Sequence, residues 1–302
     1  IMKIGNTDIT NPKIGATEIN KVFLGLNKVW ERLSFLLDSL TGSTGAFSLR
    51  LLSSSYTGDA IQVRRVSDNT TQNIGFVSNQ LDTASLNTFC SGTDGFVSIW
   101  YNQSDVSNNL IQTTLVNQPK IYDSITGVEV KNGLPTVVFN GSSYLNATNN
   151  TYGDIDDVLT TIAVVTTESN SVQMIASKGW VGNGEYLIWF NTGVTYRYAI
   201  EGQVISTTAN IPLSQQNLFS LFLSTGTNGV NQFNNGVLGK QTTTTKDLTG
   251  SSSGSVYALG YNLDKGLYHL TGNVQELLTF NSDLISDRST IEDNINTNYT
   301  IY

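Results

Sequence analysis

The side chains best suited to holding a metal ion form one short acidic run. Asp154, Asp156 and Asp157 lie in the segment YGDIDDV, and closely spaced carboxylates are typical of calcium-binding loops. The run lacks the fixed glycine and the distal glutamate of the helix–loop–helix calcium motif. We therefore expect no cofactor, and a calcium ion held by these three aspartates is the alternative.

A second chemical candidate is the tryptophan in KGWVGNG. Glycines on both sides of Trp180 predict the tip of a loop, since glycine favours turns. An indole exposed there offers apolar area that the face of a sugar ring can cover. The other aromatic residues are expected mainly in the core.

The chain contains one histidine, His269, and one cysteine, Cys90. These counts exclude multi-histidine metal sites, cysteine-based zinc sites and an internal disulfide framework. His269 lies beside strand residues, which favours a hydrogen-bonded edge residue over a ligand. Arg64 and Arg65 precede Asp68, a spacing that favours a structural ion pair.

Net charge excludes one class of partner. The formal charge is −8 and the pI is about 4.6, whereas a nucleic-acid-binding protein needs a clustered basic face. No apolar stretch approaches the roughly 20 residues that cross a bilayer. We expect neither nucleic acid nor membrane insertion.

Short apolar runs separated by Gly, Asn and Ser clusters dominate the chain from residue 45 onward. They are FVSIWY (96–101), PTVVFNG (135–141), VLTTIAVVTT (158–167), EYLIWF (185–190), TYRYAIEG (195–202), NLFSLFLSTG (217–226), SVYALGYN (255–262) and GNVQELLTF (272–280). This spacing, with almost no helical periodicity, predicts an all-β, antiparallel two-sheet sandwich. The runs 158–167 and 217–226 look buried on both faces, so we place them centrally.

The first thirty-two residues contain a decapeptide repeat over 3–12, 13–22 and 23–32, with glycine in register in each unit. Each unit is interpreted as a short β-arc, too small to bury its own apolar pair, so partners must complete it. An ordinary hairpin of the main domain is the alternative. The residues expected to make the attachment or trimerisation contacts are Ile4, Ile9, Ile14, Ile19, Leu24, Val29 and Trp30.

This repeat is similar to N-terminal segments of bacteriophage fibres and appendages, which implies an attachment or trimerisation stalk over 1–32. A closed homotrimer would cover its strand edges. Leucines with helical spacing then predict a short connector helix over 33–44. The sandwich domain is assigned to residues 45–302.

Several motifs of the main domain occur together in a known family. Ser-x-Tyr-Thr-Gly and Val-Arg-Arg-x-Ser-Asp-Asn lie in 46–76, Phe-Cys in 81–90, and Tyr-x-Gln-Ser in 94–104. In this order they resemble the opening of the α-L-arabinofuranosidase B catalytic domain. Segments 134–148 and 270–299 resemble laminin-G-like, concanavalin A-like sandwiches, whose tail carries a final strand and a short helix. The resemblance implies a concanavalin A-like jelly roll.

The resemblance also implies where a retaining glycosidase would keep its two carboxylates. The acid/base aspartate of the family follows a Leu-Gly strand end, and Asp264 stands in that place. The position corresponding to the nucleophile falls near Ile175, in a stretch without acids, and the family's adjacent cysteine pair is missing. Glu185, one residue past Gly-Asn-Gly, is the nearby substitute. We therefore expect a fold relative without hydrolase activity.

These observations together favour a bacteriophage virion surface protein, either a fibre, an appendage or a capsid decoration, with a lectin-like head that binds host-surface glycans. Other virion proteins would contact residues 1–32, and the protein would be located on the virion surface. The residues expected to bind sugar are Trp180, Asn183, Glu185, Tyr261 and Asp264. The alternatives are a glycoside hydrolase of arabinofuranosidase type and a purely structural decoration protein.

Overall fold

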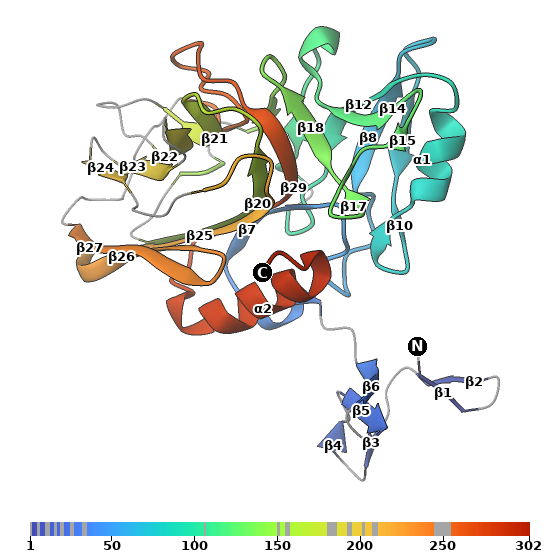
Figure 1. Cartoon of the computed structure of the whole chain (residues 1–302), viewed down its shortest axis with the longest axis horizontal. Helices are drawn as coiled ribbons and strands as arrows, with labels where there is room; N and C mark the ends of the chain where they lie inside the picture. Colours follow the sequence, from blue (N-terminus) through green and yellow to red (C-terminus); the bar gives the residue numbers. More distant parts are fainter. Residues whose placement is uncertain are drawn as a thin grey trace.

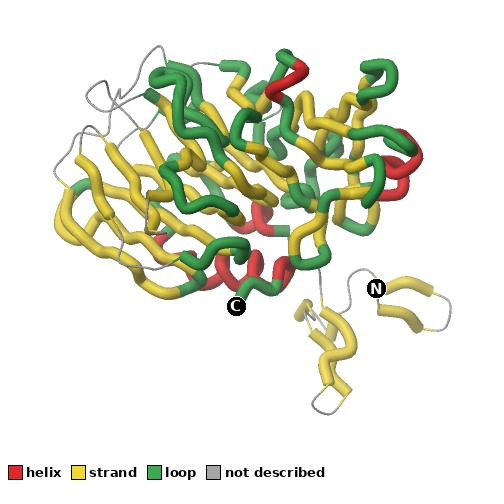
Figure 2. Tube along the Cα trace, turned by 45° about the horizontal axis from the view of Figure 1, so that its top comes forward, coloured by secondary structure: helices red, strands yellow, loops and turns green. Residues whose placement is uncertain are grey.

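The computed structural model confirms the all-β sandwich (Figures 1 and 2). It describes residues 35–105, 107–149, 152–154, 158–179, 186–191, 195–200, 203–206, 211–244 and 255–302, and the backbone of six short strands between residues 2 and 31. All strand pairs among these residues are antiparallel, as expected for a fold built from consecutive hairpins.

The first layer is centred on the two longest strands, which pair with each other along most of their length. In spatial order it contains β27 (Val237–Thr244), β26 (Gly226–Asn234), β25 (Asn217–Ser224), β20 (Val158–Thr167) and β29 (Thr271–Phe280). The far edge of β29 pairs with β7 (Ser43–Ser48) along one half and with β18 (Val137–Asn140) along the other.

The second layer carries the candidate site. In spatial order it contains β24 (Gln203–Ser206), β23 (Thr195–Ile200), β22 (Tyr186–Asn191), β21 (Gln173–Lys178), β28 (Ala258–Leu259), β19 (Leu145–Ala147) and β13 (Leu110–Ile111). The short strand β28 is therefore held between β21 and β19.

Two strands link the two layers into one continuous sheet. β12 (Gly95–Trp100) pairs with β13 of the second layer and also with β14 (Lys120–Asp123) and β8 (Ile61–Arg65). β14 in turn pairs with β18 at the edge of the first layer. The remaining short elements are β9 (Thr71–Ile74), β10 (Phe76–Val77), β11 (Gln80–Leu81), β15 (Gly127–Val128), β16 (Val130–Lys131), β17 (Leu134–Pro135), η2 (Leu115–Asn117) and η3 (Ile285–Asp287).

The main core lies between the layers and follows the two-residue period of a strand. On β25, Phe219, Leu221 and Leu223 point into this core, whereas Leu218 and Phe222 belong to a second cluster on the opposite face. The central strands β20 and β25 are thus buried on both faces, as predicted from their continuous apolar runs.

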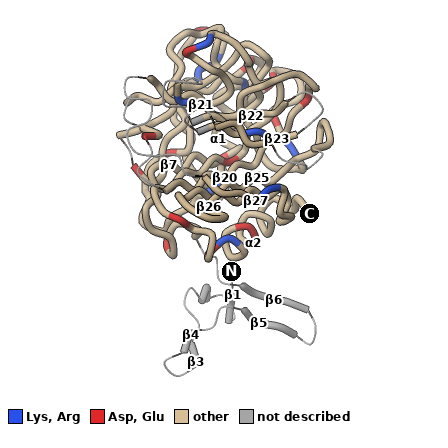
Figure 3. Tube along the Cα trace, turned by 90° about the vertical axis from the view of Figure 1, so that its left-hand side faces the viewer, with Lys and Arg blue, Asp and Glu red and all other residues tan. Residues whose placement is uncertain are grey.

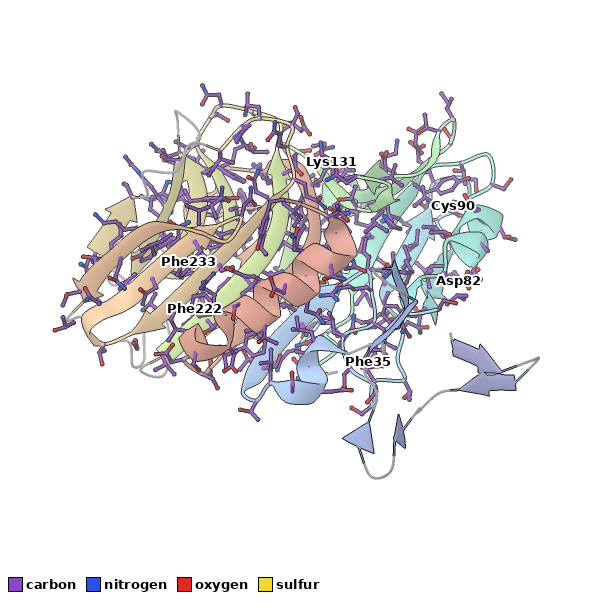
Figure 4. The ribbon with its side chains drawn as sticks, turned by 60° about the horizontal axis from the view of Figure 1, so that its bottom comes forward. Phe35, Asp82, Cys90, Lys131, Phe222 and Phe233 are labelled. Atoms are coloured by element: carbon purple, nitrogen blue, oxygen red, sulfur yellow. The ribbon has the colours of Figure 1, made fainter. Side chains whose placement is uncertain are left out.

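Helix α2 (Arg288–Tyr299) covers the outer face of the first layer (Figure 1). Beneath it, Phe222 and Phe233 meet edge to face with ring centroids 6.0 Å apart (Figure 4). The tail helix implied by the family resemblance is therefore present. A further helix, α1 (Thr83–Phe89), was not predicted; Asp82 and Cys90 cap its two ends (Figure 4).

The connector is shorter than predicted. Within the described residues 35–44, only one 3₁₀ turn, η1 (Leu36–Ser39), is helical, and β7 already begins at Ser43. The backbone N–H of Leu37 donates to the carbonyl of Leu52 at 2.9 Å, and the Asp38 carboxylate accepts from the N–H of Ser54 at 2.9 Å. The Leu37 bond engages a backbone N–H that a longer helix would use within itself, and the Asp38 bond ties the turn to the segment after Leu52. Leu36 packs into the outer cluster, as the apolar spacing indicated.

The repeat region forms three separate two-stranded hairpins. Its strands are β1 (Met2–Ile4), β2 (Thr7–Ile9), β3 (Lys13–Ile14), β4 (Thr17–Glu18), β5 (Lys21–Leu24) and β6 (Asn27–Glu31). Each hairpin pairs only with itself among the described strands. The trimerisation contacts proposed for this region concern side chains that lie outside the described residues, as does the backbone of Ile19.

Charged residues are thinly spread over the described part of the sandwich (Figure 3). Within that part, no helix is long and apolar enough to cross a membrane.

Candidate functional site

Asp264 lies in an exposed turn, five residues after the end of β28. The turn is fixed by Asn262, whose buried side chain accepts from the N–H of Lys265 at 2.8 Å and donates to the carbonyl of Gly179 at 3.1 Å. The Asp264 carboxylate accepts a hydrogen bond from the Ser255 hydroxyl at 2.8 Å. The predicted acid/base is therefore accessible to a substrate, and buried contacts position its loop.

The strand beside this loop is β21. The N–H of Gly260 donates to the carbonyl of Ile175 at 2.8 Å, and the Ser177 hydroxyl donates to the carbonyl of Tyr261 at 2.7 Å. The position that the resemblance assigns to the nucleophile thus lies next to the start of the Asp264 loop. Ile175 itself is buried in the main core and carries no acid.

Three predicted sugar-binding residues belong to the connection between β21 and β22. Trp180, Asn183 and Glu185 lie outside the described residues. Their place in the chain is nevertheless defined, because β21 ends at Lys178 and β22 begins at Tyr186, and these two residues pair with each other. The connection therefore begins and ends beside the strand that contacts the Asp264 loop.

A buried lysine fixes a second carboxylate near this edge. The Lys178 side chain is fully buried, and its ammonium donates to the carbonyl of Tyr152 at 2.9 Å and to the carboxylate of Asp154. Burial lowers the pKa of Lys178, and the bond to Asp154 opposes this shift. Asp154 therefore faces an ammonium group in this structure.

The ion pair between Lys178 and Asp154 affects the predicted calcium site, which consists of Asp154, Asp156 and Asp157. Asp156 and Asp157 lie outside the described residues. The described part of the chain contains no group of three side chains suited to holding a metal ion. Since Asp154 already pairs with Lys178, a calcium ion would have to compete with that ammonium group for the carboxylate.

Two aromatic residues near Asp264 were missed as site residues by the sequence analysis. His269 stacks on Tyr261 with ring centroids 4.0 Å apart and an interplanar angle of 19°, and Tyr144 lies 4.8 Å from Tyr261 at 34°. All three side chains are half-buried. His269 was expected to be a hydrogen-bonded edge residue, and its stacking on Tyr261 was not predicted. The contact between Tyr144 and Tyr261 was not predicted either, because no local pattern places residue 144 near residue 261.

A surface pocket of about 420 Å³ lies elsewhere, beside α1. Its lining includes Arg65, Ser85 and Phe89 and contains no carboxylate. Arg65 forms the predicted ion pair with Asp68 at 2.7 Å and lies over the Phe89 ring. Burial raises the pKa of the nearby Cys90 thiol to about 11, which keeps it unreactive near neutral pH. This pocket offers no glycosidase chemistry.

Comparison with known proteins supports the resemblance to glycosidases. Residues 38–184 match the family model described as "Alpha-L-arabinofuranosidase B, catalytic". A mutant GH54 α-L-arabinofuranosidase soaked with 4-nitrophenyl α-L-arabinofuranoside superposes with a TM-score of 0.64 at 16% identity, covering 84% of this chain and 62% of that one. A search of curated proteins finds no match.

Two related structures give the same fold. A GH54 α-L-arabinofuranosidase soaked with a cyclic sulfate inhibitor has a TM-score of 0.64, 17% identity, and coverage of 84% and 62%. An arabinofuranosidase complexed with arabinofuranosyl-α-1,2-xylobiose has a TM-score of 0.64, 16% identity, and coverage of 86% and 64%. This chain therefore spans less than two thirds of the length of each of these proteins. At this identity the likeness establishes the fold.

These findings correct the predicted function. The interpretation as a bacteriophage virion surface protein with a lectin-like head is wrong, because the matches indicate an arabinofuranosidase-type domain. The error came from giving a thirty-residue repeat more weight than motifs that extend over the sandwich. The chain is a fold relative of a glycosidase, as the sequence motifs indicated.

Proposed function

We propose that this chain is a glycoside hydrolase domain of arabinofuranosidase type, acting on α-L-arabinofuranosyl groups of glycans. The observation that carries the proposal is the exposed Asp264 carboxylate in the turn that follows β28, in a fold shared with arabinofuranosidases. The substrate class follows from the ligands named for those relatives, an aryl arabinofuranoside and an arabinofuranosyl xylobiose.

Asp264 would act as the general acid/base. In its protonated form it would donate to the glycosidic oxygen as the bond to the sugar breaks, and as a carboxylate it would then accept a proton from the attacking water. A retaining reaction needs a second carboxylate about 5–5.5 Å away that attacks the anomeric carbon. Glu185 is our candidate, because it immediately precedes β22, whose neighbour β21 contacts the Asp264 loop.

A second candidate function is sugar binding without hydrolysis. Ile175, buried in the core where the resemblance expects the nucleophile, favours it. An apolar side chain cannot attack an anomeric carbon. In this case the chain would be a relative that keeps the fold and the sugar-binding loops but lacks the reaction.

Release of nitrophenol from 4-nitrophenyl α-L-arabinofuranoside tests the proposal. We expect Asp264→Asn and Glu185→Gln each to lower kcat by at least about 100-fold. Asp293→Asn, which changes an exposed acid on α2, is the matched control and should leave kcat unchanged. If the chain binds arabinoxylan oligosaccharides without turnover, the second candidate function is supported. If it neither binds nor hydrolyses them, both candidate functions are overturned.

A further inference from the structure

Three aromatic side chains from separate segments meet beside the Asp264 loop. Tyr144 precedes β19, Tyr261 follows β28, and His269 precedes β29. None of the three belongs to the apolar clusters that form the interior. By contrast, Tyr152 and Tyr257 also pack edge to face, but both are buried in the main core. Tyr144, Tyr261 and His269 therefore lie together although they do not fill the core.

Tyr261 is the ring that contacts both of the others most closely. The centroid distances are 4.0 Å from Tyr261 to His269, 4.8 Å from Tyr261 to Tyr144, and 6.2 Å from Tyr144 to His269. These lengths are close to those of a right triangle with its corner at Tyr261. His269 therefore lies against one face of Tyr261, because their planes are nearly parallel, while Tyr144 packs against Tyr261 at a tilt of 34°.

The loop leaves room for this arrangement. Gly266 has a φ of +67°, which favours glycine at this turn, and it lies beside the Tyr261 hydroxyl, which a Cβ at that position would meet at 3.4 Å. Burial lowers the pKa of His269, so its imidazole is uncharged near neutral pH. The group is thus an uncharged aromatic cluster with two phenol hydroxyls that can form hydrogen bonds.

We propose that Tyr144 and Tyr261, supported by His269, form a stacking platform for a neutral sugar ring of the glycan that carries the scissile arabinofuranosyl group. The C–H face of a sugar ring can cover the aromatic area, and the phenol hydroxyls can bond its hydroxyl groups. Tyr261 lies three residues before Asp264, so a ring on the platform is a neighbour of the reacting bond. This inference rests on the proposed function and adds the residues that recognise the rest of the substrate.

The only histidine of the chain makes a direct binding experiment practical. The imidazole Hε1 signal of His269 is followed by proton NMR while arabinofuranosyl-xylobiose is added to the full chain. We expect a saturable shift in the wild type and a dissociation constant raised about 10-fold or more by Tyr261→Leu, which keeps an apolar side chain but removes the flat ring. Tyr261→Phe should bind within a few-fold of the wild type.

Controls separate a folding defect from a lost contact. Tyr144→Ala supplies a second test of the platform, and Tyr302→Ala, at an exposed tyrosine on the C-terminus, should leave the titration unchanged. In kinetics, Tyr261→Leu should raise KM for the branched oligosaccharide and leave kcat nearly unchanged. The small aryl arabinofuranoside should be much less affected, since its leaving group is not a sugar.

The outcomes distinguish this inference from the function on which it rests. Turnover with unchanged KM and unchanged dissociation constants in both tyrosine variants would overturn the platform and leave the hydrolase in place. A His269 shift that Tyr261→Leu weakens, without any turnover, would support the platform and overturn hydrolysis. No shift and no turnover with the wild type would overturn both.

Discussion

At the scale of single residues, the most constrained charge in the described chain is Glu276. Its side chain is fully buried on β29 and accepts from two guanidinium nitrogens of Arg50, at 2.8 and 3.0 Å. It also accepts from the Ser48 and Tyr299 hydroxyls, at 2.8 and 3.1 Å. A buried carboxylate is tolerated only with such complete pairing, so this network connects β7, β29 and α2.

We predict that Glu276→Gln lowers the free energy of unfolding by about 3 kcal/mol, because it leaves the buried Arg50 without its counter-charge. Urea denaturation measures the loss. The matched control is Glu168→Gln, which breaks the more exposed pair with Lys131 and should cost less than about 1 kcal/mol. Equal losses in the two variants would show that burial does not set the cost.

His269 gives the chain a pH-dependent contribution to stability. Burial lowers its folded-state pKa below the ordinary value of 6.5, so the unfolded chain binds more protons between these two values. Stability therefore falls as pH falls below about 6.5 through the folded-state pKa, and this loss is absent above that range. Burial raises the pKa of the neighbouring Tyr261, so this phenol stays protonated over that range.

We predict that His269→Gln weakens the acid dependence of unfolding between about pH 7 and pH 5. Its lost stacking lowers stability equally at every pH, so the informative quantity is the slope of unfolding free energy against pH. Parallel curves for the two proteins would refute a role for His269 in this dependence.

At the scale of elements, α2 shows how a weakly amphipathic sequence becomes a fixed helix. Ile291, Ile295 and Tyr299 are spaced by four residues, which aligns them on one face, and all three are buried in the outer cluster over the first layer. The helix ends at Thr300, which is left-handed with a φ of 52°. Tertiary packing therefore supplies most of its stability.

We predict that Ile295→Ala lowers the free energy of unfolding by about 3 kcal/mol, since it removes buried methyl groups and leaves a cavity. Thr297→Ala, on the exposed face of the same helix, should change it by no more than about 0.5 kcal/mol. Chemical denaturation of both variants provides the comparison. A small effect of Ile295→Ala would mean that α2 is not docked as described.

The elements also show what sequence patterns can and cannot predict. β20 was predicted with its correct bounds, because ten apolar or β-branched residues in a row fit only a central strand. Helix α1 was missed, because seven residues give too little periodicity and its main signal is one cap, the Asp82 carboxylate accepting from the N–H of Ser85 at 3.0 Å. The connector was predicted too long, because leucine spacing cannot report the bond from Leu37 to Leu52.

At the scale of the whole molecule, the candidate site illustrates the same limit. Asp264 and Tyr261 were predicted because they follow a recognisable strand end in one continuous segment. Tyr144 and His269 were not, because they reach Tyr261 only after β28 inserts between β19 and β21. Contacts of this kind depend on strand order, which local periodicity does not contain.

The repeat region raises the last whole-molecule question. Its three hairpins pair only internally among the described strands, and an isolated two-stranded hairpin is marginally stable in water. The sandwich, in contrast, has cores built from residue 36 onward. Since each decapeptide also carries apolar residues in register, we predict that residues 1–32 associate with copies of themselves, as a closed trimer that covers the strand edges.

Light scattering after size exclusion compares the 302-residue chain with one shortened to residues 33–302. We expect about three times 32.8 kDa for the longer chain and a monomer for the shorter one, because the core clusters of the described residues are built from residue 36 onward. Replacing Ile4 and Ile14 by Asp in the longer chain should also give a monomer, since charge at these positions opposes apolar association. A monomeric longer chain at all concentrations would contradict the prediction, and a trimeric shorter chain would place the contact on the sandwich instead.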